Sequence, residues 1–340
     1  MAHPESNDLD ALLRDPRPLA PVPPELVKQV VSAVSGVPTV AGAKGSGDSS
    51  GPPRGADPAL PERFGKHRVV GPIGRGGMGV VLEAEDADLG RRVAVKVLAP
   101  AMAPKPGARE RFDREARAAA AVRHENVVEI YEVGEQDGLP YFVMPLLPGE
   151  SLAARLKGGA LLPEEVVRVG REIAAGLAAA HAVGLVHRDI KPANLWLEAP
   201  KGRVKVLDFG LARLASGADR HTDTGAVVGT ADYMSPEQAS GLVINPRSDL
   251  FSLGSVLYHA ATGVKPFPGE TLPAVLRAVA DHKPPSPWAV NPMISQELSD
   301  LIERLLEKRP EDRPPGAEWV VAALDAIAAG AQAPALPPPP

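Results

Sequence analysis

Proline is unevenly distributed along this chain of 340 residues, and its distribution limits which part can fold. Residues 1–62 hold eleven of the 38 prolines together with a Gly/Ser-rich run over 41–55, and the chain ends in four consecutive prolines. Such segments bury too little apolar surface to offset the entropy of ordering the chain. We therefore expect a disordered leader over 1–62, a disordered tail over 330–340 and a folded unit over 63–329.

One segment of the leader, residues 24–35, spaces apolar residues at 26, 27, 30, 31 and 34, as one face of a helix does. Two interpretations stay open for it: a short docking helix, or a transient helix in a tail.

Composition excludes several classes of protein. The chain has no cysteine, which rules out disulfides, cysteine-ligated metals and a cysteine nucleophile. Its 37 basic and 42 acidic side chains give a net charge of −5, whereas nucleic-acid-binding proteins usually carry a basic excess. No apolar stretch reaches the roughly 20 residues that span a bilayer, and the N-terminus is not a secretory signal. We expect a cytoplasmic protein with no nucleic-acid partner and no membrane span.

The pattern of apolar residues changes along the folded unit. Its first part alternates short β-like runs with glycine turns, over 67–70, 80–85, 92–97, 127–133 and 140–144, with one helical run over 108–122. Its second part has helical periodicity over 163–183, 249–262, 272–280 and 295–306. This predicts an α+β fold with a small β-rich N-lobe (63–144), a hinge (145–149) and a larger, mainly α-helical C-lobe (150–329). A cleft between the lobes is the natural ligand site.

A glycine-rich loop opens the N-lobe. Residues 74–81 read Gly-Arg-Gly-Gly-Met-Gly-Val-Val, and the residues after them are β-like rather than helical. A dinucleotide site would need a helix there, so the loop is interpreted as a hairpin whose backbone N–H groups approach phosphate oxygens. The next strand carries Lys96 among apolar residues, and an unpaired buried lysine is costly. Glu115, on the helical run that follows, is its expected partner.

Five ordered motifs carry a resemblance to a known family. These are the glycine loop, Val-Ala-Val-Lys at 93–96, His-Arg-Asp-Ile-Lys-Pro-Ala-Asn at 187–194, Asp-Phe-Gly at 208–210 and Gly-Thr-Ala-Asp-Tyr-Met-Ser-Pro-Glu at 229–237. Their order and spacing resemble those of the eukaryotic-like protein kinases, and the residues within the motifs are most similar to those of bacterial Ser/Thr kinases of the PknB type. The resemblance implies the bilobal protein-kinase fold and transfer of the γ-phosphate of ATP to Ser/Thr hydroxyls of proteins.

The resemblance also implies roles for single residues. Asp189 would orient the substrate hydroxyl, and Lys191 would stabilise the γ-phosphate. Lys96, held by Glu115, would contact the α- and β-phosphates. Asn194 and Asp208 would hold Mg²⁺, with Mn²⁺ as an alternative cation. The residues expected to contact ATP are Ile73, Gly74, Gly76, Gly79, Val81, Ala94, Lys96, Met144, Pro145, Leu147 and Trp196.

Two of these positions depart from the family pattern. Pro145 stands where the family often has Glu, but only a carbonyl is used there, so adenine binding should survive. Trp196 stands where a smaller apolar residue usually lies under the adenine, and it would either stack on the base or narrow the pocket.

Other motif residues are expected to be structural. His187 should pack beside Phe209, and Asp249 should hold the backbone of the catalytic loop. Glu237 and Arg313 match a family salt bridge in the helical lobe.

Regulation is expected at the loop over 211–228. Thr222 and Thr224 match the autophosphorylation positions of related kinases, and phosphate there would pair with Arg188. Thr230 is expected to bond the catalytic Asp and Lys from the substrate loop. A homodimer through the N-lobe is also consistent with the resemblance. A pseudokinase scaffold and a small-molecule kinase are the alternatives, but Lys96, Asp189, Asn194 and Asp208 are all present.

Overall fold

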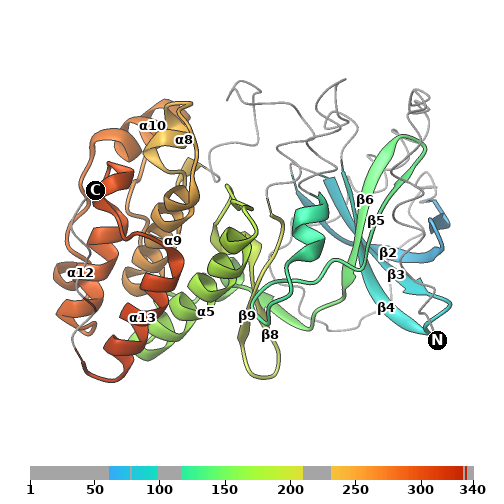
Figure 1. Cartoon of the computed structure of the whole chain (residues 1–340), viewed down its shortest axis with the longest axis horizontal. Helices are drawn as coiled ribbons and strands as arrows, with labels where there is room; N and C mark the ends of the chain where they lie inside the picture. The colour runs from blue at the N-terminus through green and yellow to red at the C-terminus, as the bar shows by residue number, and fades with distance from the viewer. Residues whose placement is uncertain (1–60, 77–78, 99–115, 210–230, 332–333, 335–340) are drawn as a thin grey trace, which may run out of the picture.

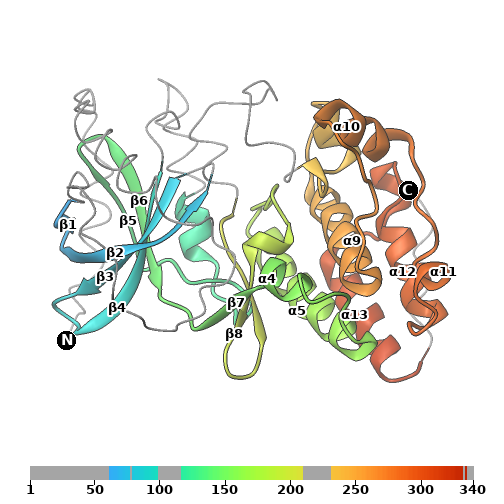
Figure 2. The same ribbon diagram turned by 180° about the vertical axis from the view of Figure 1, so that it is seen from behind.

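Two lobes make up the protein, one built on a β-sheet and the other mainly from helices (Figures 1 and 2). The computed structural model describes residues 61–76, 79–98, 116–209, 231–331 and 334. The α+β, bilobal fold expected from the sequence is confirmed. The segment over 24–35 and the terminal prolines lie outside the described residues, so those expectations remain predictions.

The N-lobe sheet has six antiparallel strands in the order β1-β2-β3-β4-β6-β5. Their bounds are β1 (Arg63–Phe64), β2 (His67–Gly76), β3 (Gly79–Asp86), β4 (Arg91–Leu98), β5 (Glu132–Gln136) and β6 (Leu139–Pro145). Side chains alternate along β3, where Val80, Leu82 and Ala84 are buried and the residues between them are partly exposed. The buried side chains pack with Val95 and Val97 of β4 into an apolar core on one face of the sheet.

Gly79 is required by the close approach of β3 to β4. Its φ is +146°, and a Cβ built there would lie 2.0 Å from the Val97 carbonyl oxygen. The third glycine of the loop motif therefore has a packing reason as well as the expected phosphate role.

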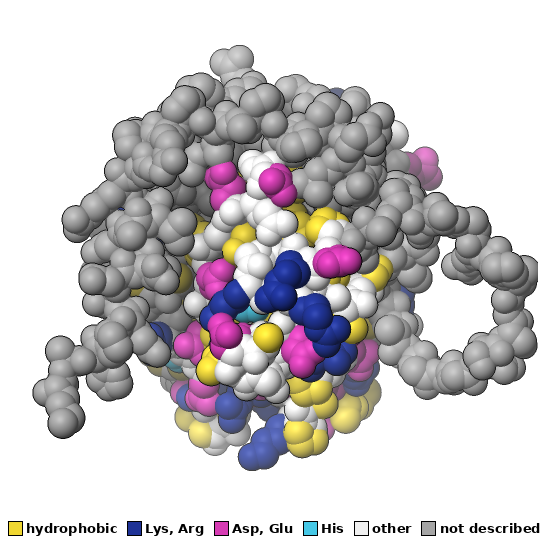
Figure 3. All heavy atoms as spheres, turned by 90° about the vertical axis from the view of Figure 1, so that its right-hand side faces the viewer, with side chains coloured by type: hydrophobic (Ala, Val, Ile, Leu, Met, Phe, Trp, Pro, Cys, Tyr) yellow, Lys and Arg dark blue, Asp and Glu magenta, His cyan; other side chains and the backbone are white. Residues whose placement is uncertain are grey.

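The end of the N-lobe carries basic and acidic side chains in mixture (Figure 3). Ion pairs join Arg92 to Glu83 at 2.5 Å and Lys66 to Asp88 at 3.5 Å. Such exposed pairs contribute little to stability.

The strand expected over 127–133 is wrong over residues 127–131. Val127 forms an isolated parallel bridge with Val206, and the Val128 N–H donates to the Val206 carbonyl at 3.0 Å. Val127 and Val206 both pack in the apolar core that fills the C-lobe, which holds this stretch against β9. The N-lobe strand β5 begins only at Glu132. Of the helical run expected over 108–122, the described residues 116–121 are helical.

A three-stranded sheet lies between the two lobes. It consists of β7 (Gly149–Ser151), β8 (Leu195–Glu198) and β9 (Arg203–Val206), with β8 in the centre. Leu195 and Leu197 of β8 and Val204 and Val206 of β9 are buried in the C-lobe core. The catalytic-loop motif precedes β8, and the Asp-Phe-Gly motif follows β9.

The C-lobe is built around two long helices, α5 (Pro163–Ala182) and α9 (Pro246–Thr262). Nearly every residue of α9 from Ser248 to Ala261 is buried, which explains its weak amphipathic pattern. Asn245 caps its start by accepting from the Arg247 N–H, and Gly263, at φ +77°, ends it in the left-handed conformation. The other helical segments are α4 (Leu152–Leu156), α8 (Pro236–Ala239), α10 (Leu272–Asp281), α11 (Pro287–Val290), α12 (Gln296–Leu305), α13 (Ala317–Ala328) and the short 3₁₀ turns η2 (Pro192–Asn194) and η3 (Pro310–Asp312).

Sequence periodicity located α5, α9, α10 and α12 but missed α13. This helix packs along α5 and buries Ala317, Val320, Ala323 and Leu324 (Figure 2). No helix within the described part of the chain is long and apolar enough to cross a membrane.

Candidate active site

The loop between α5 and β8 places Asp189 beside two polar partners. The Asp189 carboxylate oxygen Oδ2 accepts from Asn194 Nδ2 at 2.9 Å and lies 2.8 Å from the Lys191 ammonium. Asn194 Nδ2 also donates to the Asp189 carbonyl at 2.8 Å. The turn η2 begins with Pro192, whose fixed φ suits the first helical position, and brings Asn194 back over Asp189. Asp189 is thus buried but fixed by charged and polar contacts.

Asp249, in the first turn of α9, holds the backbone ahead of Asp189. Its two carboxylate oxygens accept from the His187 and Arg188 N–H groups, each at 2.8 Å, and Oδ2 also contacts His181 Nε2 at 2.8 Å. Arg188 has a φ of +66°, which is unfavourable for a residue with a Cβ and persists only where its surroundings enforce it. The expectation that Asp249 supports the loop backbone is confirmed.

His187 has the structural position expected for it. Its ring lies 4.8 Å from the Phe209 ring, centroid to centroid, and its Nε2 lies 2.8 Å from the Leu207 carbonyl oxygen. A fully buried imidazole committed to a backbone carbonyl is a poor general base. This contact ties the Asp189 loop to the segment that carries Asp208.

Lys96 and Asp208 join the two lobes. The ammonium of Lys96, on β4, lies 2.6 Å from Asp208 Oδ2, just beyond β9. The lysine side chain is 11% exposed and the aspartate side chain 29% exposed. A lysine among apolar strand residues is therefore neutralised by a carboxylate, as its burial requires.

The register of the N-lobe sheet gathers the expected nucleotide contacts on one face. Val81 pairs with Gly74 on one side and with Lys96 on the other, and Ala94 pairs with Met144. Directly paired residues share a face, as do Ala94 and Lys96, which are two positions apart. This face is opposite to the apolar core of the sheet. Pro145 ends β6 opposite Val93, Leu147 follows in the hinge, and Ile73 lies at a register shift in β2.

Trp196 lies on the face of β8 opposite to Leu195 and Leu197. Its indole Nε1 donates to the Pro148 carbonyl at 3.1 Å, so the ring is anchored to the hinge. An indole N–H normally takes such a partner, and the bond fixes the orientation of the ring.

Several expected site residues lie outside the described part of the chain. They are Glu115, Thr222, Thr224 and Thr230. For Gly76 only the backbone, at the end of β2, is described.

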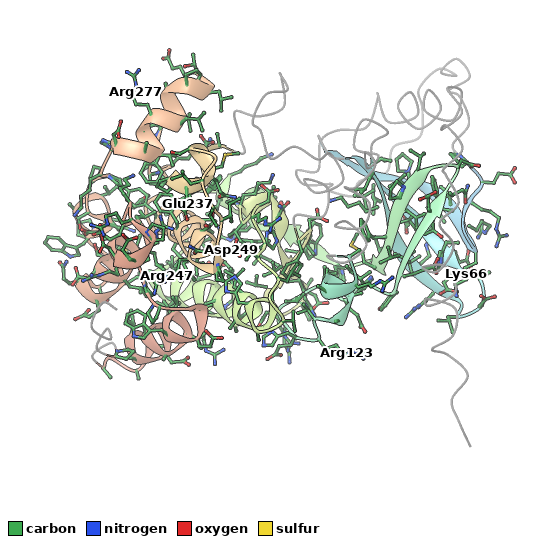
Figure 4. The ribbon with its side chains drawn as sticks, turned by 45° about the horizontal axis from the view of Figure 1, so that its top comes forward. Lys66, Arg123, Glu237, Arg247, Asp249 and Arg277 are labelled. Carbon is green, nitrogen blue, oxygen red and sulfur yellow. The ribbon has the colours of Figure 1, made fainter. Side chains whose placement is uncertain are left out.

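The expected salt bridge between Glu237 and Arg313 is confirmed, and it is buried and bidentate. Arg313 Nη1 and Nη2 donate to the two Glu237 oxygens at 2.7 and 2.9 Å, and the Ser248 hydroxyl donates to Oε1 at 2.6 Å. Burial alone would raise the pKa of Glu237, but the bonds from Arg313 and Ser248 hold it below its usual value. Glu237, Arg247 and Asp249 lie close together around the start of α9 (Figure 4).

Gln238 is a positioning residue that the sequence did not reveal. Its Nε2 donates to the Arg188 carbonyl at 2.8 Å, so α8 contacts the backbone next to Asp189. The only sequence signal was the capping box formed by Ser235 and Gln238, which explains the helix start but not the loop contact.

The oxygen donors at the site suit Mg²⁺. Asp208 supplies a carboxylate, and Asn194, with Nδ2 committed to Asp189, has its amide oxygen left to coordinate. Mg²⁺ prefers such hard oxygen ligands and normally completes its shell with phosphate and water rather than an all-protein cage. Accordingly, the described residues contain no group of three or more His, Cys, Asp and Glu side chains that would hold a metal alone.

Comparison with known proteins agrees with this geometry. The protein kinase domain family matches residues 67–323. The chain is 43% identical over 260 residues to the serine/threonine-protein kinase Pkn1 of Myxococcus xanthus, covering 76% of this chain and 37% of that protein. It is 39% identical over 277 residues to PknA of Mycobacterium tuberculosis, covering 79% of this chain and 63% of that protein.

Solved structures give the same result. The crystal structure of the Mycobacterium tuberculosis PknI kinase domain is 28% identical, with a TM-score of 0.64, and the match covers 78% of this chain and 99% of that one. The chain belongs to the protein kinase family, and it groups with the bacterial eukaryotic-like (Hanks-type) serine/threonine kinases. It spans about two fifths of the length of Pkn1 and of a probable serine/threonine-protein kinase from Streptomyces coelicolor.

Proposed function

We propose that the protein is an active serine/threonine protein kinase that transfers the γ-phosphate of Mg-ATP to protein hydroxyls. The observation that carries the proposal is the arrangement of Asp189, Lys191 and Asn194 in one loop, with Lys96 of the N-lobe paired to Asp208 beyond β9. Phosphoryl transfer needs positioned charge more than covalent chemistry, and this site is built from positioned charges.

Asp189 is the residue proposed to act on the substrate hydroxyl. Its known contacts, from Asn194 and Lys191, both involve Oδ2, so Oδ1 is the oxygen assigned to accept the hydroxyl hydrogen bond. Asn194 and the Asp249-bound backbone fix the carboxylate, which reduces the reorganisation needed when the hydroxyl attacks. The proton would pass from the hydroxyl to this carboxylate as the new O–P bond forms and the bond from the γ-phosphorus to the bridging oxygen breaks, with ADP as the leaving group.

Lys191 and Lys96 supply the positive charge. Lys191, 2.8 Å from Asp189, would contact the transferred phosphoryl group. Lys96 would hold the α- and β-phosphates, with Glu115 as a further partner. Mg²⁺, held by Asp208 and the Asn194 amide oxygen, would neutralise phosphate charge that builds up during transfer.

The nucleotide is proposed to lie between the two sheets. Val81, Ala94 and Met144 share the sheet face that carries Lys96, and Trp196, on β8 of the second sheet, would contact the adenine from the other side. The hinge would contact the adenine through backbone groups of Pro145 and Leu147. Ile73, Gly74, Gly76 and Gly79 complete the proposed ATP contacts from the glycine loop.

Regulation by autophosphorylation at Thr222 and Thr224 is part of the proposal, with Thr230 in the substrate loop. It rests on their match to the family positions and on the rigid placement of the Arg188 backbone by Asp249. A cytoplasmic location and a homodimer through the N-lobe are proposed on the sequence resemblance alone.

Two other functions remain testable against this one. A pseudokinase would bind nucleotide without transfer, and a small-molecule kinase would not label proteins. The complete set of Lys96, Asp189, Asn194 and Asp208 favours catalysis, and the segment from Ala231 to Glu237, which packs against the catalytic loop through α8, favours a peptide substrate.

One assay separates the three classes. Wild type, Asp189→Asn and the surface control Asp88→Asn are incubated with γ-labelled Mg-ATP and a generic basic protein. Asp88 is a suitable control because its side chain is 70% exposed. We expect label on protein with wild type and Asp88→Asn, and none with Asp189→Asn. Equal labelling by Asp189→Asn, or no labelling by wild type, would contradict the proposal.

A further inference from the structure

A charge pair joins the segment that leads from the substrate loop into α8 to the chain that follows α9. Lys265, just beyond α9, places its ammonium 2.5 Å from Asp232 Oδ2. The two side chains differ in exposure, because Lys265 is 44% exposed whereas Asp232 is 4% exposed. The carboxylate is therefore covered, and the molecular surface at this point presents the cation.

The neighbouring aromatic pair adds no negative charge. The Tyr233 hydroxyl lies 2.8 Å from His259 Nδ1, and the rings are 6.2 Å apart. Burial, and next Lys265, lower the pKa of His259, although Asp232 opposes the shift. Burial and Asp232 raise the pKa of Tyr233. Both side chains are thus neutral at pH 7, so Lys265 provides the exposed charge of this cluster.

Lys265 lies within reach of a bound peptide. The chain from Asp232 to Gln238 is six residues long, and Gln238 contacts the carbonyl of Arg188, which precedes Asp189. An extended segment of that length spans about 20 Å at most. The actual path is shorter, because the Met234 N–H bonds back to the Ala231 carbonyl at 3.2 Å. A substrate peptide rises about 3.3 Å per residue, so a side chain within about six positions of the acceptor can meet Lys265.

We propose that Lys265 is a specificity-determining residue that selects protein substrates with an acidic side chain within about six residues of the phosphoacceptor. The inference rests on the proposed kinase activity and deepens it. An acidic substrate side chain meets an ammonium already held in place by Asp232, which lowers the entropy lost on pairing. A basic side chain at the same position meets the cation and is rejected, because Lys265 covers the carboxylate that would attract it.

Peptide kinetics test the proposal directly. A set of otherwise neutral peptides carries one Ser or Thr acceptor and either Asp, Ala or Lys at each position from −6 to +6. Wild type should phosphorylate the Asp peptide with a kcat/KM about three- to tenfold above the Ala peptide at one position, and the Lys peptide should be poorer still. The effect should lie mainly in KM, since the pair forms before transfer.

Three variants assign the preference to Lys265. Lys265→Arg keeps the charge and should keep the ratio of Asp to Ala peptide. Because Lys265→Met alone leaves Asp232 buried without its partner, the double variant Asp232→Asn/Lys265→Met removes both charges, and its ratio should fall to about one. Lys201→Met is the matched control. Lys201 lies in the exposed turn between β8 and β9, remote from α8 (Figure 1). The ratio of kcat/KM for the Asp and Ala peptides in Lys201→Met should equal that of wild type.

Each remaining outcome would overturn the proposal. If wild type shows no preference for the Asp peptide at any position, Lys265 has no role in selection. The same conclusion follows if the preference survives in the double variant. Equal losses on Asp and Ala peptides would show that the pair only supports the fold. Phosphorylation of peptides without charge preference removes this inference but leaves the proposed function intact, whereas no transfer to any peptide or protein removes both.

Discussion

The N–H of Arg188 donates to Asp249 Oδ1 at 2.8 Å and joins the catalytic loop to the first turn of α9. Arg188 is held at a φ of +66°, which costs on the order of 1–3 kcal/mol without such support. The second oxygen of Asp249 accepts from the His187 N–H and contacts His181. A single buried carboxylate therefore fixes the backbone that carries Asp189.

Replacing this carboxylate tests its role. Asp249→Asn keeps the shape but turns one acceptor oxygen into a donor that faces N–H groups, so at least one bond is lost. We expect a loss of about 2–4 kcal/mol in the free energy of unfolding, because buried donors are left without an acceptor. Phosphoryl transfer should fall at least tenfold, about 1.4 kcal/mol. Urea denaturation and single-turnover transfer measure the two effects, and unchanged values in both would contradict the assignment.

The bridge between Glu237 and Arg313 predicts strongly non-additive stability. Glu237→Gln alone should cost about 3–5 kcal/mol, because the Arg313 guanidinium stays buried without a countercharge. Arg313→Met alone should cost a similar amount for the reverse reason. The double variant should be less destabilised than the sum of the two single variants, by at least about 1 kcal/mol. A cycle of urea unfolding curves measures this coupling, and additive losses would show that the two side chains do not act as a pair.

Lys308 predicts a pH dependence of stability in the alkaline range. Its ammonium donates to the Val279 carbonyl at 2.7 Å and lies 4.2 Å from the Phe267 ring centre. Burial, and next Arg313, lower the pKa of Lys308 to about 8. Between that value and the ordinary lysine pKa near 10.4, the unfolded chain binds a proton that the folded chain has released. Stability contributed by this group therefore rises with pH across that window.

The size of the rise is limited by solvent. Because Lys308 is only partly buried, we expect about 1 kcal/mol rather than the full value of the pKa shift. The free energy of unfolding is compared for wild type and Lys308→Met from pH 7.5 to 9.5, below the ordinary tyrosine pKa near 10. The difference curve should slope in favour of wild type as pH rises, and parallel curves would contradict the prediction.

Trp196 offers a spectroscopic view of the nucleotide site. The chain has three tryptophans, and only Trp196 is proposed to contact the adenine. Adding Mg-ADP should change tryptophan emission in a saturable way, and Trp196→Phe should lose most of the change. Trp288→Phe is the control, since Trp288 lies on α11 and is 47% exposed. A response that persists in Trp196→Phe but is lost in Trp288→Phe would contradict the proposed contact between Trp196 and the adenine.

Much of the site was predictable because its residues are close in sequence or on strands of regular period. Asp189, Lys191 and Asn194 lie within six residues of one another, and the turn η2 brings them together. Val81 and Lys96 lie on successive antiparallel strands, so alternation alone places them on a common face.

What sequence reasoning missed depends on contacts between distant segments. Val127 and Val128 read as an N-lobe strand, but they pair with Val206, and no local pattern specifies that parallel bridge. The start of α13 has Gly316 as its N-cap, with no side-chain capping bond, so the usual start signal is missing. The bond from Gln238 to the Arg188 carbonyl likewise appears only once α8 packs on the loop.

The most direct test of the account is the transfer step in Asp189→Asn, measured under single-turnover conditions alongside nucleotide binding. If Asp189 accepts the substrate proton, the rate of phosphoryl transfer should fall by about 10²–10⁴-fold. Mg-ATP affinity should stay within about threefold, below 1 kcal/mol, because the proposed nucleotide contacts are made by other residues. Transfer at the wild-type rate with nucleotide bound would contradict the role assigned to Asp189 and, with it, the proposed mechanism.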